Sequence, residues 1–151
     1  MDRRTFLGSA LAAGTTSLVT FRPLFAHSAT RLVIYKSPAC GCCAKWVDHV
    51  KASGFQTEVH DVEDVNAIKS KHGVPEELYS CHTALADNYV FEGHVPAELV
   101  TRVLKEKPKI VGIAAPGMPI GSPGMEMGGR KDPHKIIAFT RDGKTSVYAQ
   151  R

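Results

Sequence analysis

The sequence lacks the features that mark several classes of protein. It has no long uninterrupted apolar run that would predict a membrane span, no internal repeat and no long low-complexity tract. It has no basic stripe with interleaved aromatic residues, although its formal net charge is +4, so nucleic acid is not an expected partner. Two separated C-x-x-C pairs, which are usual in structural zinc sites, are also absent.

The first 28 residues predict a twin-arginine export signal. Arg3 and Arg4 precede a short stretch of apolar and small residues at 9–19, and a cleavable small-residue site follows. An uncleaved membrane anchor is the alternative. Removing this segment takes away three arginines and one aspartate, so the formal net charge falls from +4 to +2. We expect residues 29–151 to form one periplasmic domain that does not insert stably into the membrane.

Hydrophobic patterns and turn signals predict an α/β fold in this domain. The predicted elements are a strand at 31–36, a helix at 43–53, a strand at 56–60, a helix between Asp61 or Asp64 and Gly73, a hairpin of 83–86 and 89–92, and a helix between Pro96 and Pro108. This β-α-β-α-β-β-α order is typical of thioredoxin-like proteins. Strands at 110–114, 135–140 and 145–149 predict a C-terminal β-hairpin appendage, and residues 115–129 a loop rich in Met, Gly and Pro.

Three of the four cysteines, Cys40, Cys42 and Cys43, lie within four residues between the first predicted strand and helix. Thiolates are soft ligands and strong nucleophiles, and the positive end of a helix dipole favours the thiolate form. The cluster therefore indicates soft-metal binding or thiol redox chemistry. In a thioredoxin-like arrangement the loop after the first strand faces the segment before the third, so we expect Cys81 to lie beside the other three.

The spacing of the cysteines does not decide whether they form disulfides, act as a reactive dithiol or bind a metal. Only the Cys40–Cys43 pair has relaxed C-x-x-C spacing for a disulfide, and Cys42 and Cys81 would be left over. A metal cluster or a reactive dithiol explains the pattern better than a disulfide scaffold. A single Zn²⁺ held by four cysteines would be crowded. Several Cu(I) ions suit adjacent thiolates better, because one sulfur can bridge two ions.

Other candidate ligands accompany the cysteines. His82 follows Cys81 directly and offers an imidazole nitrogen, and Met118, Met125 and Met127 offer thioether sulfurs that prefer Cu(I). The Met-x-Met spacing would place two sulfurs near one ion in an extended loop, although the methionines could instead be hydrophobic plugs. For His94 we favour a role at the entry to the third helix over a role as a ligand.

Four blocks of sequence together resemble the CopG-type periplasmic copper-resistance family. They read YKSPACGCCAKW, GVPEELYSCHTA, EGHVPAE and VGIAAPGMPIGSPGME, and the resemblance spans residues 32–147. It implies a thioredoxin-like fold and a polynuclear, thiolate-bridged copper centre. On matching positions it nominates Cys40, Cys42, Cys43, Cys81 and His82 as metal ligands, with the methionine loop as support.

We therefore expect a periplasmic protein of copper homeostasis or resistance that binds Cu(I). Its role would be sequestration, transfer to other periplasmic copper-handling proteins, or interconversion of Cu(I) and Cu(II). The alternative is a thiol–disulfide oxidoreductase that uses the Cys40/Cys43 pair. A third hypothesis, a structural zinc domain, would hold one Zn²⁺ tightly.

Overall fold

The structure is a computed structural model that describes residues 30–151; the predicted export signal lies outside the described residues. The described part is a mixed α/β fold with three α-helices and seven strands. In chain order the elements are β1 (Arg31–Lys36), α1 (Gly41–Ala52), β2 (Gln56–Asp61), α2 (Val65–Lys71), the 3₁₀ turn η1 (Glu76–Leu78), β3 (His82–Ala86), β4 (Tyr89–Gly93), α3 (Ala97–Glu106), β5 (Gly112–Ala115), β6 (Lys135–Phe139) and β7 (Thr145–Gln150). This order confirms the succession of strands and helices predicted from the sequence.

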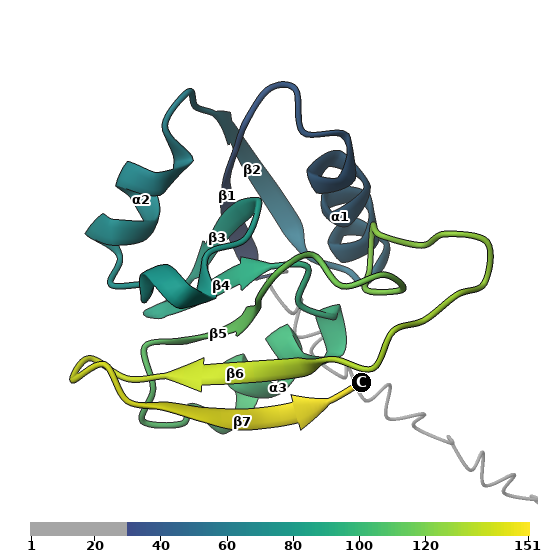
Figure 1. Cartoon of the computed structure of the whole chain (residues 1–151). Helices are drawn as coiled ribbons and strands as arrows, with labels where there is room; N and C mark the ends of the chain where they lie inside the picture. The colour runs from purple at the N-terminus through teal and green to yellow at the C-terminus, as the bar shows by residue number, and fades with distance from the viewer. Residues whose placement is uncertain (1–29) are drawn as a thin grey trace, which may run out of the picture.

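All seven strands form one sheet, in the order β2-β1-β3-β4-β5-β6-β7 (Figure 1). β1 pairs with β2 in parallel and with β3 in antiparallel fashion, and β3 continues into β4 through a hairpin. The C-terminal strands were expected to form an appendage, and this was wrong. β5 pairs in parallel with β4, and β6 and β7 extend the same sheet, because α3 returns the chain to the open edge of β4.

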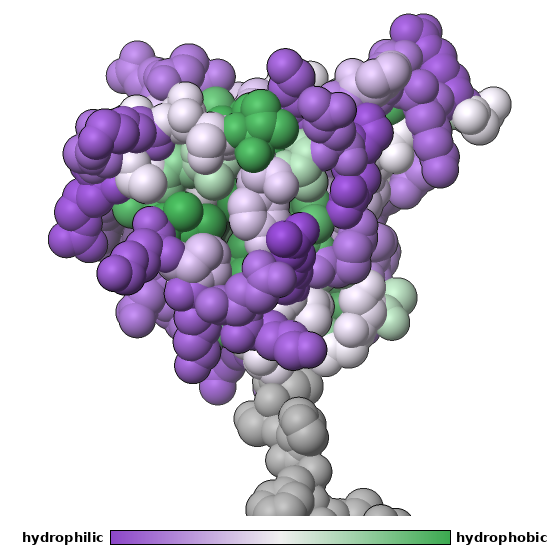
Figure 2. Space-filling view, turned by 90° about the horizontal axis from the view of Figure 1, so that it is seen from below, coloured by the Kyte–Doolittle hydropathy of each residue, from purple (hydrophilic) through white to green (hydrophobic). Residues whose placement is uncertain are grey.

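The sheet separates two groups of buried apolar side chains. The larger group packs beneath α1 and α3 and includes Trp46, Phe91 and Ile113. The smaller group lies on the opposite face and includes Val90 and Ala114, the neighbours of Phe91 and Ile113 in sequence. This alternation follows from the two-residue period of side chains along a strand. Seen from below the view of Figure 1, the surface is mainly hydrophilic, with separate hydrophobic areas between the polar groups (Figure 2).

Helix α1 begins two residues before the predicted start. Cys40 is its N-cap, and the sulfur accepts a hydrogen bond from the Cys43 amide at 3.4 Å. Both Cys42 and Cys43 therefore lie inside the first helical turn. Trp46 anchors the helix, because its indole N–H donates to the Val95 carbonyl at 2.8 Å and its ring is fully buried.

Strand register brings Cys81 to the same end of the sheet as α1. Lys36, the last residue of β1, pairs with His82, the first residue of β3. The loop from β1 to α1 and the segment before β3 therefore meet at one edge. Among residues 30–151, none of the helices has the length and apolar content needed to cross a lipid bilayer.

Candidate metal centre

The four cysteines converge at this edge of the sheet. Their sulfur atoms all lie within 4.8 Å of one another, although β2, α2 and η1 separate Cys81 from the other three along the chain. The Cys40 and Cys42 sulfurs are 3.5 Å apart, and the Cys43 sulfur lies 3.6 Å from the Cys81 carbonyl oxygen. The prediction that the distant cysteine lies beside the other three is confirmed.

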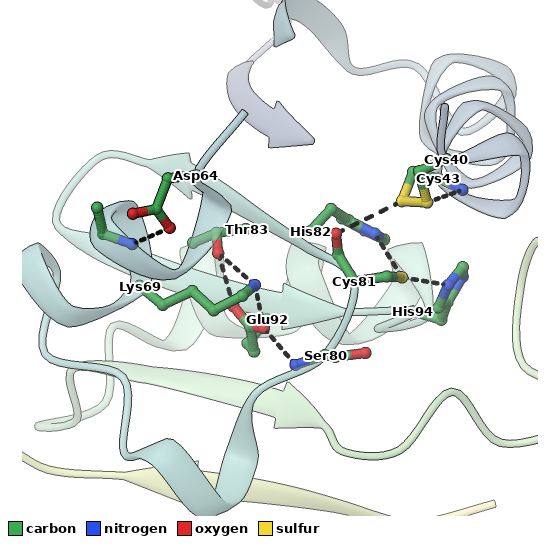
Figure 3. A network of polar contacts seen from close by, with 11 residues as sticks. Cys40, Cys43, Asp64, Lys69, Ser80, Cys81, His82, Thr83, Glu92 and His94 are labelled. Atoms are coloured by element: carbon green, nitrogen blue, oxygen red, sulfur yellow. Dashed lines mark hydrogen bonds and ion pairs between the residues drawn. A yellow bond between two sulfur atoms is a disulfide. The ribbon is translucent and has the colours of Figure 1, made fainter. Parts of the chain in front are cut away.

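Two of the four sulfurs are joined. Cys40 and Cys43 form a disulfide (Figure 3). Cys42 and Cys81 are free thiols. Among the three clustered cysteines, this is the pair with relaxed C-x-x-C spacing. Because a disulfide sulfur is a poor metal ligand compared with a thiolate, all four sulfurs become donors only after this bond is reduced.

Cys81 is a neutral thiol in these surroundings. Burial raises its pKa to about 12, and the neighbouring Cys42 thiol adds to the rise. Its sulfur lies 2.9 Å from His94 Nε2 and 3.4 Å from His82 Nδ1. A soft cation that binds here would displace the thiol proton, so metal binding would release a proton from Cys81.

His94 belongs to the site, which differs from the helix-entry role that the sequence favoured. Its Nδ1 lies 2.7 Å from the Pro123 carbonyl oxygen, and a carbonyl can only accept, so Nδ1 carries the hydrogen. Nε2 therefore presents its lone pair to the Cys81 sulfur. Burial lowers the pKa of His94, which keeps the ring neutral. Thr83 pairs with Glu92 in the β3–β4 hairpin, and the same register extended by two residues places Cys81 opposite His94. The predicted hairpin was therefore the sequence signal that could have identified His94.

His82 supplies a second buried imidazole. Its ring lies between Trp46, 4.4 Å away, and His94, 5.0 Å away between centroids. Burial holds the pKa of His82 well below its ordinary value, so this ring is also neutral. Its Nε2 is buried without a hydrogen-bond partner, and Nδ1 faces Cys81. Cys81, His82 and His94 form a second set of donor atoms within 4.8 Å of one another.

The methionine-bearing loop packs on the site through its backbone. Gly124 has a φ of +86°, and a Cβ there would lie 2.8 Å from the Cys42 carbonyl oxygen and 2.9 Å from the Trp46 backbone nitrogen. Met125, the next residue, is half-buried, whereas Met118 and Met127 are 43% and 59% exposed. The loop is not extended, because the Met125 amide closes a turn onto the Ser122 carbonyl. Met125 and Met127 consequently lie in different surroundings.

The donor atoms fit a soft metal ion. The first group consists of four cysteines and the second of one cysteine and two histidines, and no carboxylate belongs to either of them in the described part of the chain. Thiolate sulfur and neutral imidazole suit Cu(I) and Zn²⁺, whereas Mg²⁺ and Ca²⁺ prefer oxygen. The orphaned His82 Nε2 and the two neutral rings add nitrogen donors that need no deprotonation.

Comparisons with known proteins point in the same direction. A family model described as "Protein of unknown function, DUF411" matches residues 78–125, the segment that carries Cys81, His82, His94, Met118 and Met125. The chain is similar to the solved structure of copper resistance protein CopG in Form 2, with 42% identity, a TM-score of 0.78, and coverage of 82% of this chain and 98% of that one. For Form 1 of that protein the identity is 43% and the TM-score 0.77, with the same coverage. No protein with a curated description matches the chain.

Proposed function

Because the chain belongs to the CopG-type copper-resistance family, we propose that it is a copper-binding protein of metal homeostasis that holds Cu(I) on its cysteine cluster. The observation that carries this proposal is the convergence of Cys81 with Cys40, Cys42 and Cys43, whose sulfurs lie within 4.8 Å of one another. Cu(I) is the soft ion that such a sulfur set prefers. Its storage, transfer or interconversion with Cu(II) would serve copper resistance.

The close packing of sulfurs favours more than one ion. Cys42 and Cys43 are adjacent in the first turn of α1, and Cys40 caps the same helix, so a tetrahedron of all four sulfurs around one ion would be crowded. A bridging thiolate serves two ions and removes this difficulty. His82 and His94 would complete the coordination from the side of β3 and β4. His94 would bind through Nε2, since Pro123 holds its Nδ1 hydrogen.

The oxidation state of the cysteines would control access to the site. Reduction of the Cys40–Cys43 disulfide takes two electrons and two protons and restores all four thiols. In the disulfide form, only Cys42 and Cys81 remain as thiol donors beside the two imidazoles. Loading with several Cu(I) ions therefore requires the reduced protein.

The loop with Met118, Met125 and Met127 would cover the copper centre or pass ions to it. Contact of Gly124 with the N-terminal turn of α1 supports the first role for the middle of the loop. Exposure of Met118 and Met127 supports the second, because an exposed thioether can meet an incoming Cu(I) donor.

We also propose a thioredoxin-like fold class and a periplasmic location reached by the twin-arginine pathway. The order β2-β1-β3-β4, with β1 parallel to β2 and antiparallel to β3, supports the fold class. Arg3 and Arg4 before a short apolar stretch support the export route. Other periplasmic copper-handling proteins would then be the natural partners.

Cu(I) titration of the reduced chain tests the function directly. Under anaerobic conditions, in competition with a chromophoric Cu(I) chelator, the protein should bind more than one Cu(I) per chain, and Cys42→Ser should lose most of this capacity. Ala44→Ser is the matched control, because it adds a hydroxyl at an exposed position in the same part of α1 and leaves every thiol in place. A Cys42→Ser protein that binds as much Cu(I) as the control would contradict the proposal.

One observation favours a second candidate, a thiol–disulfide oxidoreductase. Cys40 and Cys43 form a disulfide at the N-terminus of α1, where a catalytic C-x-x-C pair would lie. The Cys42 sulfur, 3.5 Å from Cys40, would compete as a second attacking thiol. An insulin-reduction assay on the metal-free protein separates the two functions. Rapid turnover that is lost in Cys40→Ser favours the oxidoreductase, and absence of turnover favours the copper protein.

A further inference from the structure

A buried polar network lies behind Cys81, and the proposed copper chemistry does not use it. Lys69 on α2 and Glu92 on β4 are 1% and 0% exposed, and Lys69 Nζ lies 2.6 Å from Glu92 Oε1. The Thr83 hydroxyl on β3 donates to Glu92 Oε2 at 2.7 Å and accepts from Lys69 at 3.1 Å. The network thus joins a helix to two strands at the edge where the cysteines meet (Figure 3).

The network ends on the backbone that carries Cys81. The Ser80 amide donates to Glu92 Oε1 at 2.6 Å, and Ser80 directly precedes Cys81. On its other side Ser80 packs against Gly93, where an added Cβ would overlap the Ser80 side chain and lie 2.9 Å from the Ala115 carbonyl oxygen. The carboxylate and the glycine together fix the Ser80 backbone without touching the Cys81 sulfur.

Stability alone does not explain a charged pair in this position. A buried ion pair must be stripped of water, and apolar residues of similar volume are often equally or more stabilising. Burial raises the pKa of Glu92, while Lys69, Thr83 and the Ser80 amide act in the opposite direction. A carboxylate has enough acceptor capacity to bind the ammonium group, the hydroxyl and the amide at once, whereas an apolar side chain would leave the Ser80 amide without this acceptor.

The thiol that this backbone carries has close neighbours on several sides. Cys81 Sγ lies 2.9 Å from His94 Nε2 and 3.4 Å from His82 Nδ1, and within 4.8 Å of the other cysteine sulfurs. Since Cys81 lies outside any strand or helix, the regular ladder of β3 does not hold it. Its two neighbours in sequence are both held: His82 pairs with Lys36 at the start of β3, and the Ser80 amide donates to Glu92.

We propose that Glu92 is a positioning residue for Cys81. Lys69 balances the buried charge of the Glu92 carboxylate, a carboxylate oxygen holds the Ser80 amide, and the amide fixes the Cys81 thiol beside Cys42 and against the two histidines. The value of this placement for copper rests on the proposed function, in which Cys81 is a ligand. The placement itself is a property of the metal-free chain and can be measured there.

The test measures how strongly the fold holds Cys42 and Cys81 together. In a Cys40→Ser/Cys43→Ala background, these are the two remaining thiols. Oxidised glutathione takes two electrons from them and yields a Cys42–Cys81 disulfide and two molecules of reduced glutathione. The equilibrium ratio, read by mass spectrometry of the trapped protein, gives the effective concentration of one thiol at the other.

Two double variants isolate the contact with Ser80. Lys69→Met/Glu92→Gln removes both charges and keeps an acceptor for the Ser80 amide, whereas Lys69→Met/Glu92→Leu removes the acceptor as well. The Gln variant should keep the effective concentration within about threefold of the background, and the Leu variant should lose about tenfold, the effect of one hydrogen bond to a polar partner. Ile136→Ala, at a fully buried core position on β6, is the control for loss of stability alone and should leave the ratio unchanged.

Three outcomes overturn the proposal: no disulfide in the background protein, equal effective concentrations in the two double variants, or an equal loss in Ile136→Ala. Should a double variant fail to fold, Glu92→Asp serves instead, because it withdraws the carboxylate by one methylene and should also lower the ratio. A copper titration of the same variants separates this proposal from the function. Unchanged thiol coupling refutes the positioning role even if copper binds. Lowered coupling in a chain that binds no copper refutes the function and leaves the positioning intact.

Discussion

In the metal-free protein with the Cys40–Cys43 disulfide intact, Cys81 should be alkylated slowly, with a rate that keeps rising with pH. Burial raises its pKa from the ordinary 9.0 to about 12, so the thiolate fraction at pH 7 falls by about a thousandfold. The effect follows from the surroundings of the sulfur. Burial disfavours both the Cys81 thiolate and the His94 imidazolium, so the pair 2.9 Å apart is a neutral thiol beside a neutral imidazole.

Iodoacetamide labelling followed by peptide mass spectrometry measures this rate for each cysteine separately. Because the thiolate is the reactive form, the Cys81 rate should increase about tenfold per pH unit from pH 7 to 10 without reaching a plateau. Slow labelling alone would not be decisive, since burial also hinders the reagent. The shape of the pH profile is decisive, because hindered access lowers the rate equally at every pH.

Cys42→Ser tests the cause of the raised pKa. Burial is the larger contribution and the Cys42 thiol a smaller one, so this variant should lower the Cys81 pKa only in part and leave it above 9.0. A plateau near pH 7 in the unsubstituted protein would refute the reasoning, since it would reveal a thiolate–imidazolium pair of the kind that activates catalytic cysteines.

Three further predictions concern the parts of the fold that hold the site. Gly124→Ala should lower the free energy of unfolding, measured by urea denaturation, by about 1–3 kcal/mol. The reason is that Gly124 has a φ of +86° and that an added methyl group would lie 2.8 Å from the Cys42 carbonyl oxygen. An unchanged denaturation midpoint would show that the loop does not pack on α1. Asp64→Ala should cost about 1 kcal/mol by removing the cap of α2, whose carboxylate accepts from the Ala67 amide at 3.0 Å, and Asp64→Asn should restore most of it. The free energy of unfolding of the disulfide form should fall as the pH rises from 9.0 to about 12, because the raised pKa of Cys81 stabilises the fold below pH 9.0 and this contribution is lost over that interval. Cys81→Ser should remove that slope.

Much of the fold was accessible from local patterns. The strand Arg31–Lys36 and the hairpin around Asp87 and Asn88 were predicted almost to the residue, because a short run of β-favouring residues and a two-residue turn are strong local signals. The way in which the C-terminal strands pair was not accessible from local patterns. Whether β5–β7 form a separate hairpin or extend the sheet depends on the direction in which α3 returns the chain, and that is set by long-range packing.

Some residues of the site were also predictable from the sequence, and others were not. Adjacent cysteines before a helix were visible in the sequence, and the order of elements placed Cys81 beside them. The role of His94 was missed, because a histidine next to a helix start has an ordinary local explanation. Only the register of β3 and β4 shows that His94 faces Cys81. The Lys69–Glu92 pair was likewise out of reach, since its residues come from α2 and β4 and no local pattern in the sequence pairs them.

The most direct test of the account is the Cu(I) content and copper X-ray absorption spectrum of the reduced protein beside those of Cys81→Ser. Four converging sulfurs predict several Cu(I) ions per chain, copper–sulfur scattering with a short copper–copper distance, and loss of at least part of the bound copper when the downstream thiol is removed. Equal copper content and identical spectra in the two proteins would show that Cys40, Cys42 and Cys43 suffice without Cys81, and would contradict the central claim.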